Sequence, residues 1–174
     1  MRALQVRREY SFYLQTLNFG DQFRTVINPF TGKTLEVPID RGMTAAEIKS
    51  IQILFHENHV EGPEPEFEGY ALRTDDGTSL RFRCHVLDAD YSLTCIAVEL
   101  VTPDPTDEVL NIILDVARAG CLALTSATGD GVRTIDDAPT SAQLARWPEA
   151  ITIKTVADLR DWLSSTIGFR EVRG

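Results

Sequence analysis

The segment from Asp104 to Gly120 constrains the fold of this chain most strongly. Asp104 can cap a helix, Pro105 suits the first helical position, and two acidic residues follow where the helix dipole is positive. Gly120 is typical of a helix end. The apolar residues between these ends form a wide stripe: Val109, Leu110, Ile112, Ile113, Leu114, Val116 and Ala117. A helix with such a stripe lies flat on a sheet, so we expect the rest of the chain to supply one.

Strand patterns flank this helix on both sides. In the first strand, alternation buries Tyr10 and Phe12 together and leaves Tyr13 on the other face. Asn28 to Gly32 reads as a hairpin turn, because its proline sets one backbone angle and its glycine can adopt a left-handed conformation. Short acidic turns join three later strands into an antiparallel meander. The predicted strands cover residues 9–17, 24–27, 33–37, 67–74, 79–87, 93–101, 121–126, 132–135 and 169–172.

Two further helices are predicted from their first turns. Thr44 and Glu47 have the spacing of a capping box, which predicts a helix over 44–59. Thr155 with Asp158 begins a last helix, and Ser141 to Trp147 reads as a short helical turn before Pro148. We therefore predict a single α+β domain over residues 1–174, with about three helices packed on a mostly antiparallel sheet.

The composition of the chain indicates the cellular compartment in which we expect the protein. It contains no apolar run of 18 residues, which excludes a membrane-spanning helix. Its first residues lack the apolar core of a signal peptide. Cys84, Cys95 and Cys121 form no Cys-x-x-Cys pair and each lies in an apolar run, so we expect small buried side chains in a reducing compartment. The expected location is the cytoplasm.

The net charge of −9 is concentrated in the middle of the chain. Residues 61–140 hold 5 basic and 16 acidic side chains, whereas the segments on either side are nearly balanced. A nucleic-acid binder needs clustered Lys and Arg to neutralise phosphates, so this distribution argues against direct nucleic-acid binding. An acidic field instead speeds the encounter with a basic protein, although it also serves solubility alone.

The acidic middle segment contains the candidate partner-binding residues. Two prolines hold residues 61–68 extended as a connecting loop, which lowers the entropy lost when the loop docks on a basic surface. A solvated linker would have the same composition. The predicted partner-binding residues are Glu61, Glu64, Glu66, Glu68, Asp88 and Asp90.

Two other clusters suggest different chemistry. Arg81, Arg83 and His85 alternate along one predicted strand and share a face that meets either solvent or a ligand. His56 and His59 are three residues apart, whereas the zinc-protease motif requires a spacing of four, and histidines at a helix end also complement its dipole. No nucleophile elbow or phosphate loop occurs, so we predict no catalytic residue, no metal and no cofactor.

The plan of the chain resembles the small acidic immunity-type proteins that bacteria encode beside polymorphic toxins. The resemblance is carried by the opening strand Glu9 to Leu14, and by the passage from Val116 to Leu124 that runs into Thr128 to Gly131. It implies an α+β domain that blocks a cognate toxin through an acidic face. These families share no fixed contact motif, so the resemblance transfers no functional residue.

Together these features favour a non-catalytic protein-binding domain, expected to be an immunity-type inhibitor that presents its acidic segment to a basic, toxin-like protein. The alternative is an enzyme or small-molecule-binding protein with a site around Arg81, Arg83 and His85. The sequence leaves the oligomeric state open, and an unpaired edge strand or the region of Trp147 offers a contact between copies.

Overall fold

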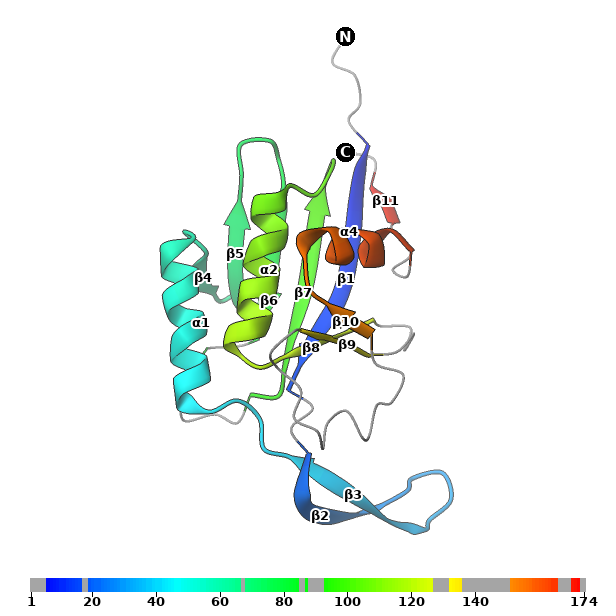
Figure 1. The fold of residues 1–174 in the computed structure, drawn as a ribbon. Helices are drawn as coiled ribbons and strands as arrows, with labels where there is room; N and C mark the ends of the chain where they lie inside the picture. The colour runs from blue at the N-terminus through cyan, green and yellow to red at the C-terminus, as the bar shows by residue number, and fades with distance from the viewer. Residues whose placement is uncertain are drawn as a thin grey trace.

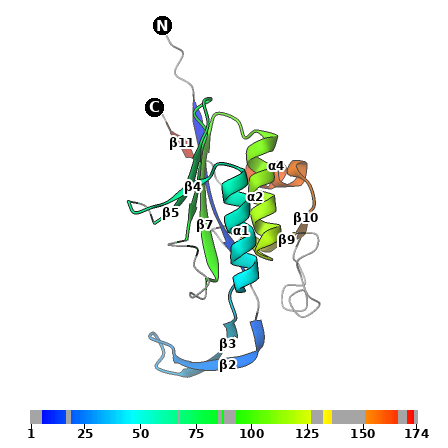
Figure 2. The same cartoon turned by 90° about the vertical axis from the view of Figure 1, so that its left-hand side faces the viewer.

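The computed structural model describes residues 6–16, 19–66, 68–84, 87, 93–126, 132–135, 151–165 and 170–172. Three helices in these ranges cover one face of a large sheet: α1 (Ala45–Glu57), α2 (Asp107–Ala119) and α4 (Val156–Ser165) (Figures 1 and 2). The strands of this sheet are β1 (Arg7–Gln15), β4 (Glu61–Glu64), β5 (Gly69–Arg73), β6 (Ser79–Arg83), β7 (Cys95–Thr102), β8 (Ala123–Ser126), β9 (Val132–Ile135), β10 (Ile151–Ile153) and β11 (Arg170–Val172). A separate hairpin consists of β2 (Phe19–Ile27) and β3 (Thr34–Asp40).

The first strand of the sequence lies in the interior of the large sheet. The strand order is β10-β9-β8-β1-β7-β6-β5-β4, and β11 pairs with the beginning of β1 beside β8. All of these pairs are antiparallel except that between β10 and β9. The predicted α+β class, the mostly antiparallel sheet and the meander of β5, β6 and β7 are therefore confirmed.

Alternation along the strands separates the core from the outer face of the sheet. Tyr10, Phe12 and Leu14 of β1 are buried beneath the helices, and the ring of Phe12 meets Trp162 of α4 edge to face at 5.5 Å between centroids. Tyr13 lies on the other face, as predicted. We call the face opposite the helices the open face. It also carries Arg81 of β6 and its cross-strand neighbour Glu99 of β7.

The helix ends follow from local side-chain bonds. Thr44 caps α1, and its side chain and that of Glu47 form the predicted capping box. Gly120 ends α2 as predicted, but the prediction of Asp104 as its cap was wrong. Thr106 caps the helix instead, because its hydroxyl accepts from the backbone N–H of Val109.

The structure also corrects the prediction for residues 61–68. These residues were expected to form a connecting loop, but Glu61 to Glu64 form β4 at the edge of the sheet, antiparallel to β5. Pro63 is compatible with this place because an edge strand need not donate every backbone N–H. The three-residue strand β10 was not predicted. The predicted turn at 141–147 lies outside the described residues.

None of the helices in the described ranges has the length and apolar character needed to cross a membrane.

Candidate functional site

The four predicted glutamates lie in β4 and in the turn that follows it at the edge of the sheet, and they differ in their surroundings. Glu61, Glu66 and Glu68 are exposed. Glu64 is half-buried and accepts two hydrogen bonds from the guanidinium of Arg73, each at 3.2 Å. This pair partly neutralises the acidic edge, although such surface pairs contribute less than about 1 kcal/mol to stability. Asp88 and Asp90 lie outside the described residues.

The two arginines of the alternative hypothesis share one carboxylate on the open face. Arg83 Nη1 lies 3.0 Å from Glu99 Oε1, and Arg81 Nη1 lies 3.8 Å from Glu99 Oε2. This arrangement follows from the register of β6 and β7, which places Arg81 directly opposite Glu99. His85 lies outside the described residues, so its place beside the arginines stays a prediction.

The histidines and cysteines are spread over separate elements. His56 and His59 are exposed at the end of α1, and within the described ranges no three His, Cys, Asp or Glu side chains gather closely enough to hold a metal ion. The three cysteines are free thiols. Cys84 is buried as predicted, whereas Cys95 and Cys121 are only partly buried, so the prediction was wrong for these two. Burial raises the pKa of the Cys84 thiol to about 12. Such a thiol is a packing residue.

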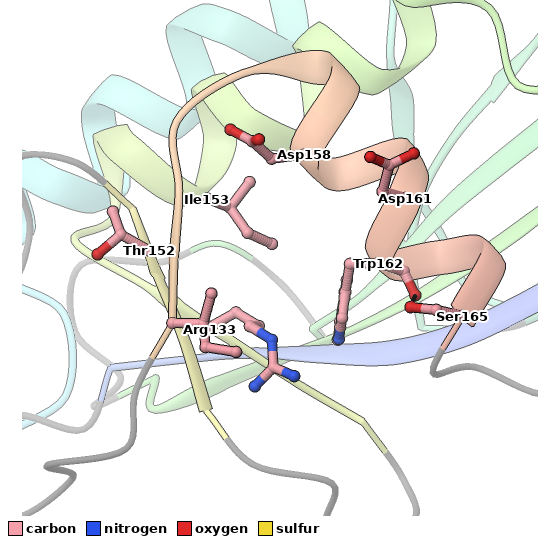
Figure 3. Close-up of a pocket in the computed structure, with 8 residues that line it drawn as sticks. Arg133, Thr152, Ile153, Asp158, Asp161, Trp162 and Ser165 are labelled. Carbon is pink, nitrogen blue, oxygen red and sulfur yellow. Dashed lines mark hydrogen bonds between the residues drawn. The ribbon is translucent and has the colours of Figure 1, made fainter.

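A pocket of about 250 Å³ lies between α4 and the strands β9 and β10. Figure 3 shows the carboxylates of Asp158 and Asp161 on the helix side and the guanidinium of Arg133 on the strand side. Asp158 already serves the fold, because its Oδ2 accepts from the backbone N–H groups of Lys154 and Thr155. These bonds hold the pKa of Asp158 below its ordinary value. The pocket is smaller than the ~300–1,000 Å³ typical of ligand sites.

Among the described residues, the β2–β3 hairpin carries the densest group of exposed large apolar side chains. Figures 1 and 2 show it projecting beyond the sheet and extending toward the side opposite the helices. Its exposed large apolar residues are Phe23 (52%), Ile27 (72%), Phe30 (94%), Leu35 (46%) and Ile39 (37%). A two-stranded hairpin of this kind is marginally stable alone, and clusters of exposed apolar residues mark interaction sites.

The tip of the hairpin is held in one conformation by its own turn. The side-chain oxygen of Asn28 accepts from the backbone N–H groups of Phe30 and Thr31, at 2.8 and 3.2 Å. Gly32 has φ of +65° and donates its N–H to the carbonyl of Asn28. These bonds present the ring of Phe30 to solvent on an ordered backbone, which lowers the entropy lost on binding.

The base of the hairpin is tied to the main sheet by Asp40. One carboxylate oxygen accepts from the hydroxyl of buried Thr16, at the end of β1, at 2.6 Å, and the other accepts from the N–H of Gly42 at 2.9 Å. The bond from Thr16 therefore attaches the arm to the end of β1, and the bond from Gly42 fixes the chain as it leaves β3.

The sequence predicted this hairpin but did not identify it as a functional element. The signal was present in the sequence, because apolar side chains lie on both faces of the hairpin and at its tip: Phe23, Ile27, Phe30 and Leu35. A hairpin packed on a core would instead bury only one face.

No protein-family model and no curated protein sequence matches this chain.

Proposed function

We propose that this chain is a non-catalytic protein-binding domain of the immunity type, which docks on a basic protein through the β2–β3 hairpin. The observation that carries the proposal is the set of large apolar side chains exposed on an ordered, projecting arm. An isolated apolar residue on a surface needs no explanation, but five on 22 residues of one hairpin require a partner surface.

The size of the apolar surface indicates what else the partner must contact. Phe23 and Phe30 expose 52% and 94% of their surface, which at ~200 Å² per phenylalanine is roughly 290 Å². Burying it contributes about 7 kcal/mol at ~25 cal/mol per Å², while association costs on the order of 4–15 kcal/mol. The hairpin needs a second contact to give a stable complex.

The acidic β4 edge is suited to be that second contact. Figure 2 shows that the turn between β4 and β5 extends to the same side of the sheet as the hairpin. Glu61, Glu66 and Glu68 are exposed there, whereas Asp75 and Asp76 lie in the turn at the opposite end of β5 (Figure 1). Carboxylates at the rim of an interface guide a basic partner into register and raise the association rate. A basic partner with an apolar cleft therefore fits both features.

The proposal is tested by capture from an extract of the source organism on immobilised protein, at low and at high salt. Phe30→Ser removes the apolar tip, and Ile53→Ser is the matched control because Ile53 is a 49% exposed apolar residue of α1. We expect one stoichiometric basic protein to be retained by the wild type and by Ile53→Ser and lost by Phe30→Ser. Equal retention by all three, or no retained protein at either salt, would overturn the proposal.

A further inference from the structure

The outer edge of β2 carries a row of backbone groups available for pairing. The N–H of Asn28 donates to the carbonyl of Lys33, so these residues form a hydrogen-bonded pair, and antiparallel strands alternate such pairs with non-hydrogen-bonded ones. By this alternation, the N–H and C=O groups of Phe23, Thr25 and Ile27 point away from β3. Within the described ranges no strand pairs with this edge.

The two edges of the hairpin are not equivalent. On β3 the outward-pointing positions are Thr34, Glu36 and Pro38, the register partners of Ile27, Thr25 and Phe23. Pro38 has no N–H to donate, and an exposed charge such as that of Glu36 discourages further pairing. On β2 the outward-pointing positions Phe23, Thr25 and Ile27 include no proline and no charged residue, and the exposed charge of Arg24 lies at a position whose backbone groups point toward β3. An added strand is therefore expected on β2.

The β2 edge is complementary to itself. We propose that β2 pairs antiparallel with β2 of a second copy of this chain, about a twofold axis at Thr25, to give a four-stranded ribbon. This register uses every outward-pointing N–H and C=O of Phe23, Thr25 and Ile27 in both copies. It sets Phe23 of one copy beside Ile27 of the other, an aromatic and β-branched pair of a kind that stabilises sheets. The interface is isologous and closes as a dimer.

Charge and shape both favour a second copy at this edge. The hairpin, residues 19–40, holds two basic and three acidic side chains, a net charge of −1, whereas the whole chain carries −9. Two copies can thus meet here without bringing their acidic segments together. Figures 1 and 2 show that the arm extends well beyond the helices and the main sheet, so the bodies lie apart when the arms pair. The pairing turns a marginal two-stranded hairpin into a ribbon of four strands.

This inference rests on the proposed function in that it uses the same arm, and it adds that two arms together form the apolar surface. The twofold axis is perpendicular to the plane of the ribbon, so Phe23 and Ile27 of both copies lie on the same face. The tip with Phe30 lies beyond the paired residues. Tip and edge variants therefore separate partner binding from pairing.

The first test is the mass of the purified full chain across a concentration series by light scattering. The wild type is expected to rise from 19.4 kDa toward twice that mass. Thr25→Pro, which removes the central N–H of the exposed edge, is expected to stay at 19.4 kDa. Phe30→Ser is expected to dimerise like the wild type. A wild type that remains monomeric, or a Thr25→Pro variant that dimerises normally, would overturn the pairing.

The second test does not depend on the folding of the proline variant. Facing residues of a hydrogen-bonded antiparallel pair have Cα atoms ~5.5 Å apart, within disulfide range. Thr25→Cys is therefore expected to form a covalent dimer under mild oxidation. Glu36→Cys, an equally exposed position on the other edge, is the control and is expected to stay monomeric. Equal crosslinking of both variants, or none with Thr25→Cys, contradicts the register.

The two proposals fail separately. If the wild type is monomeric and still captures a basic protein through Phe30, the pairing is wrong and the proposed function stands. If the dimer forms through Thr25 and Phe30→Ser captures partners as well as the wild type does, the pairing stands and the proposed role of the tip is wrong.

Discussion

Replacing Phe30 and Phe82 by alanine in separate variants tests whether the hairpin tip is free surface. Phe30 is 94% exposed, so only about 12 Å² of its ~200 Å² is covered, which is worth about 0.3 kcal/mol. Phe82 is fully buried, and its ring centroid lies 4.9 Å from that of Phe55. Truncating a buried phenylalanine costs about 3–5 kcal/mol. The same substitution should therefore differ about tenfold in cost between the two sites.

The free energy of unfolding, from urea titrations followed by circular dichroism, measures both costs. We expect the free energy of unfolding of Phe30→Ala to stay within about 0.5 kcal/mol of that of the wild type, and that of Phe82→Ala to fall by about 3–5 kcal/mol. In a chain of this size the loss in Phe82→Ala corresponds to a thermal midpoint lower by roughly 6–20 °C. A loss above about 1 kcal/mol for Phe30→Ala would mean that the tip packs inside the chain. The tip would then not be available to a partner, and the proposed role of the hairpin would be wrong.

Three further predictions address the attachment of the arm, the first helix and the buried thiol. Asp40→Ala removes the nearer of two acceptors of the Thr16 hydroxyl, which also lies 3.3 Å from the carbonyl oxygen of Thr94, and it removes the acceptor of the Gly42 N–H. The substitution should cost about 1–3 kcal/mol and speed amide exchange at the base of the hairpin, and unchanged exchange would contradict the anchoring role. Burial raises the pKa of Glu47, but hydrogen bonds with Thr44 and Arg41 lower this pKa more, so that it lies below its ordinary value of 4.5. The ionised carboxylate therefore stabilises the fold above pH 4.5, and this stabilisation is lost as the pH falls through the folded-state pKa. Acid titrations should therefore show a steeper loss for the wild type than for Glu47→Gln, and parallel curves would argue against these bonds. A thiol reagent at mildly alkaline pH should leave Cys84 unmodified in the folded chain, because its pKa is raised to about 12, and rapid labelling of all three thiols would contradict its burial.

The sequence predicted the features that depend on a few neighbouring residues. The capping box of Thr44 and Glu47 was confirmed because both of its bonds lie within four residues. The turn from Asn28 to Gly32 was confirmed for the same reason. The cap of α2 was misplaced by two residues because Asp104 and Thr106 are both suitable capping residues, and only the course of the chain past Pro105 selects between them.

The candidate surfaces were predicted less completely because they combine distant segments. Glu64 and Arg73 were both visible in the sequence, but their ion pair requires β4 to add to the sheet edge. The sharing of Glu99 by Arg81 and Arg83 likewise requires the register of β6 on β7. The sequence shows how many charged residues each segment contains, but binding of a partner depends on which of these charges have no ion-pair partner at the surface.

The sequence by itself determined the hairpin, the helices, the alternation of β1 and the acidity of the middle segment, because capping, turn geometry and periodicity act over a few residues. Only the tertiary structure decided that β1 lies inside the sheet, that the three helices cover a single face, and that the hairpin extends beyond them. Strand order and exposure depend on how the whole chain buries its apolar surface. The apolar residues of the arm have no such cover within the described chain, and for that reason the arm is the surface that we propose meets a partner.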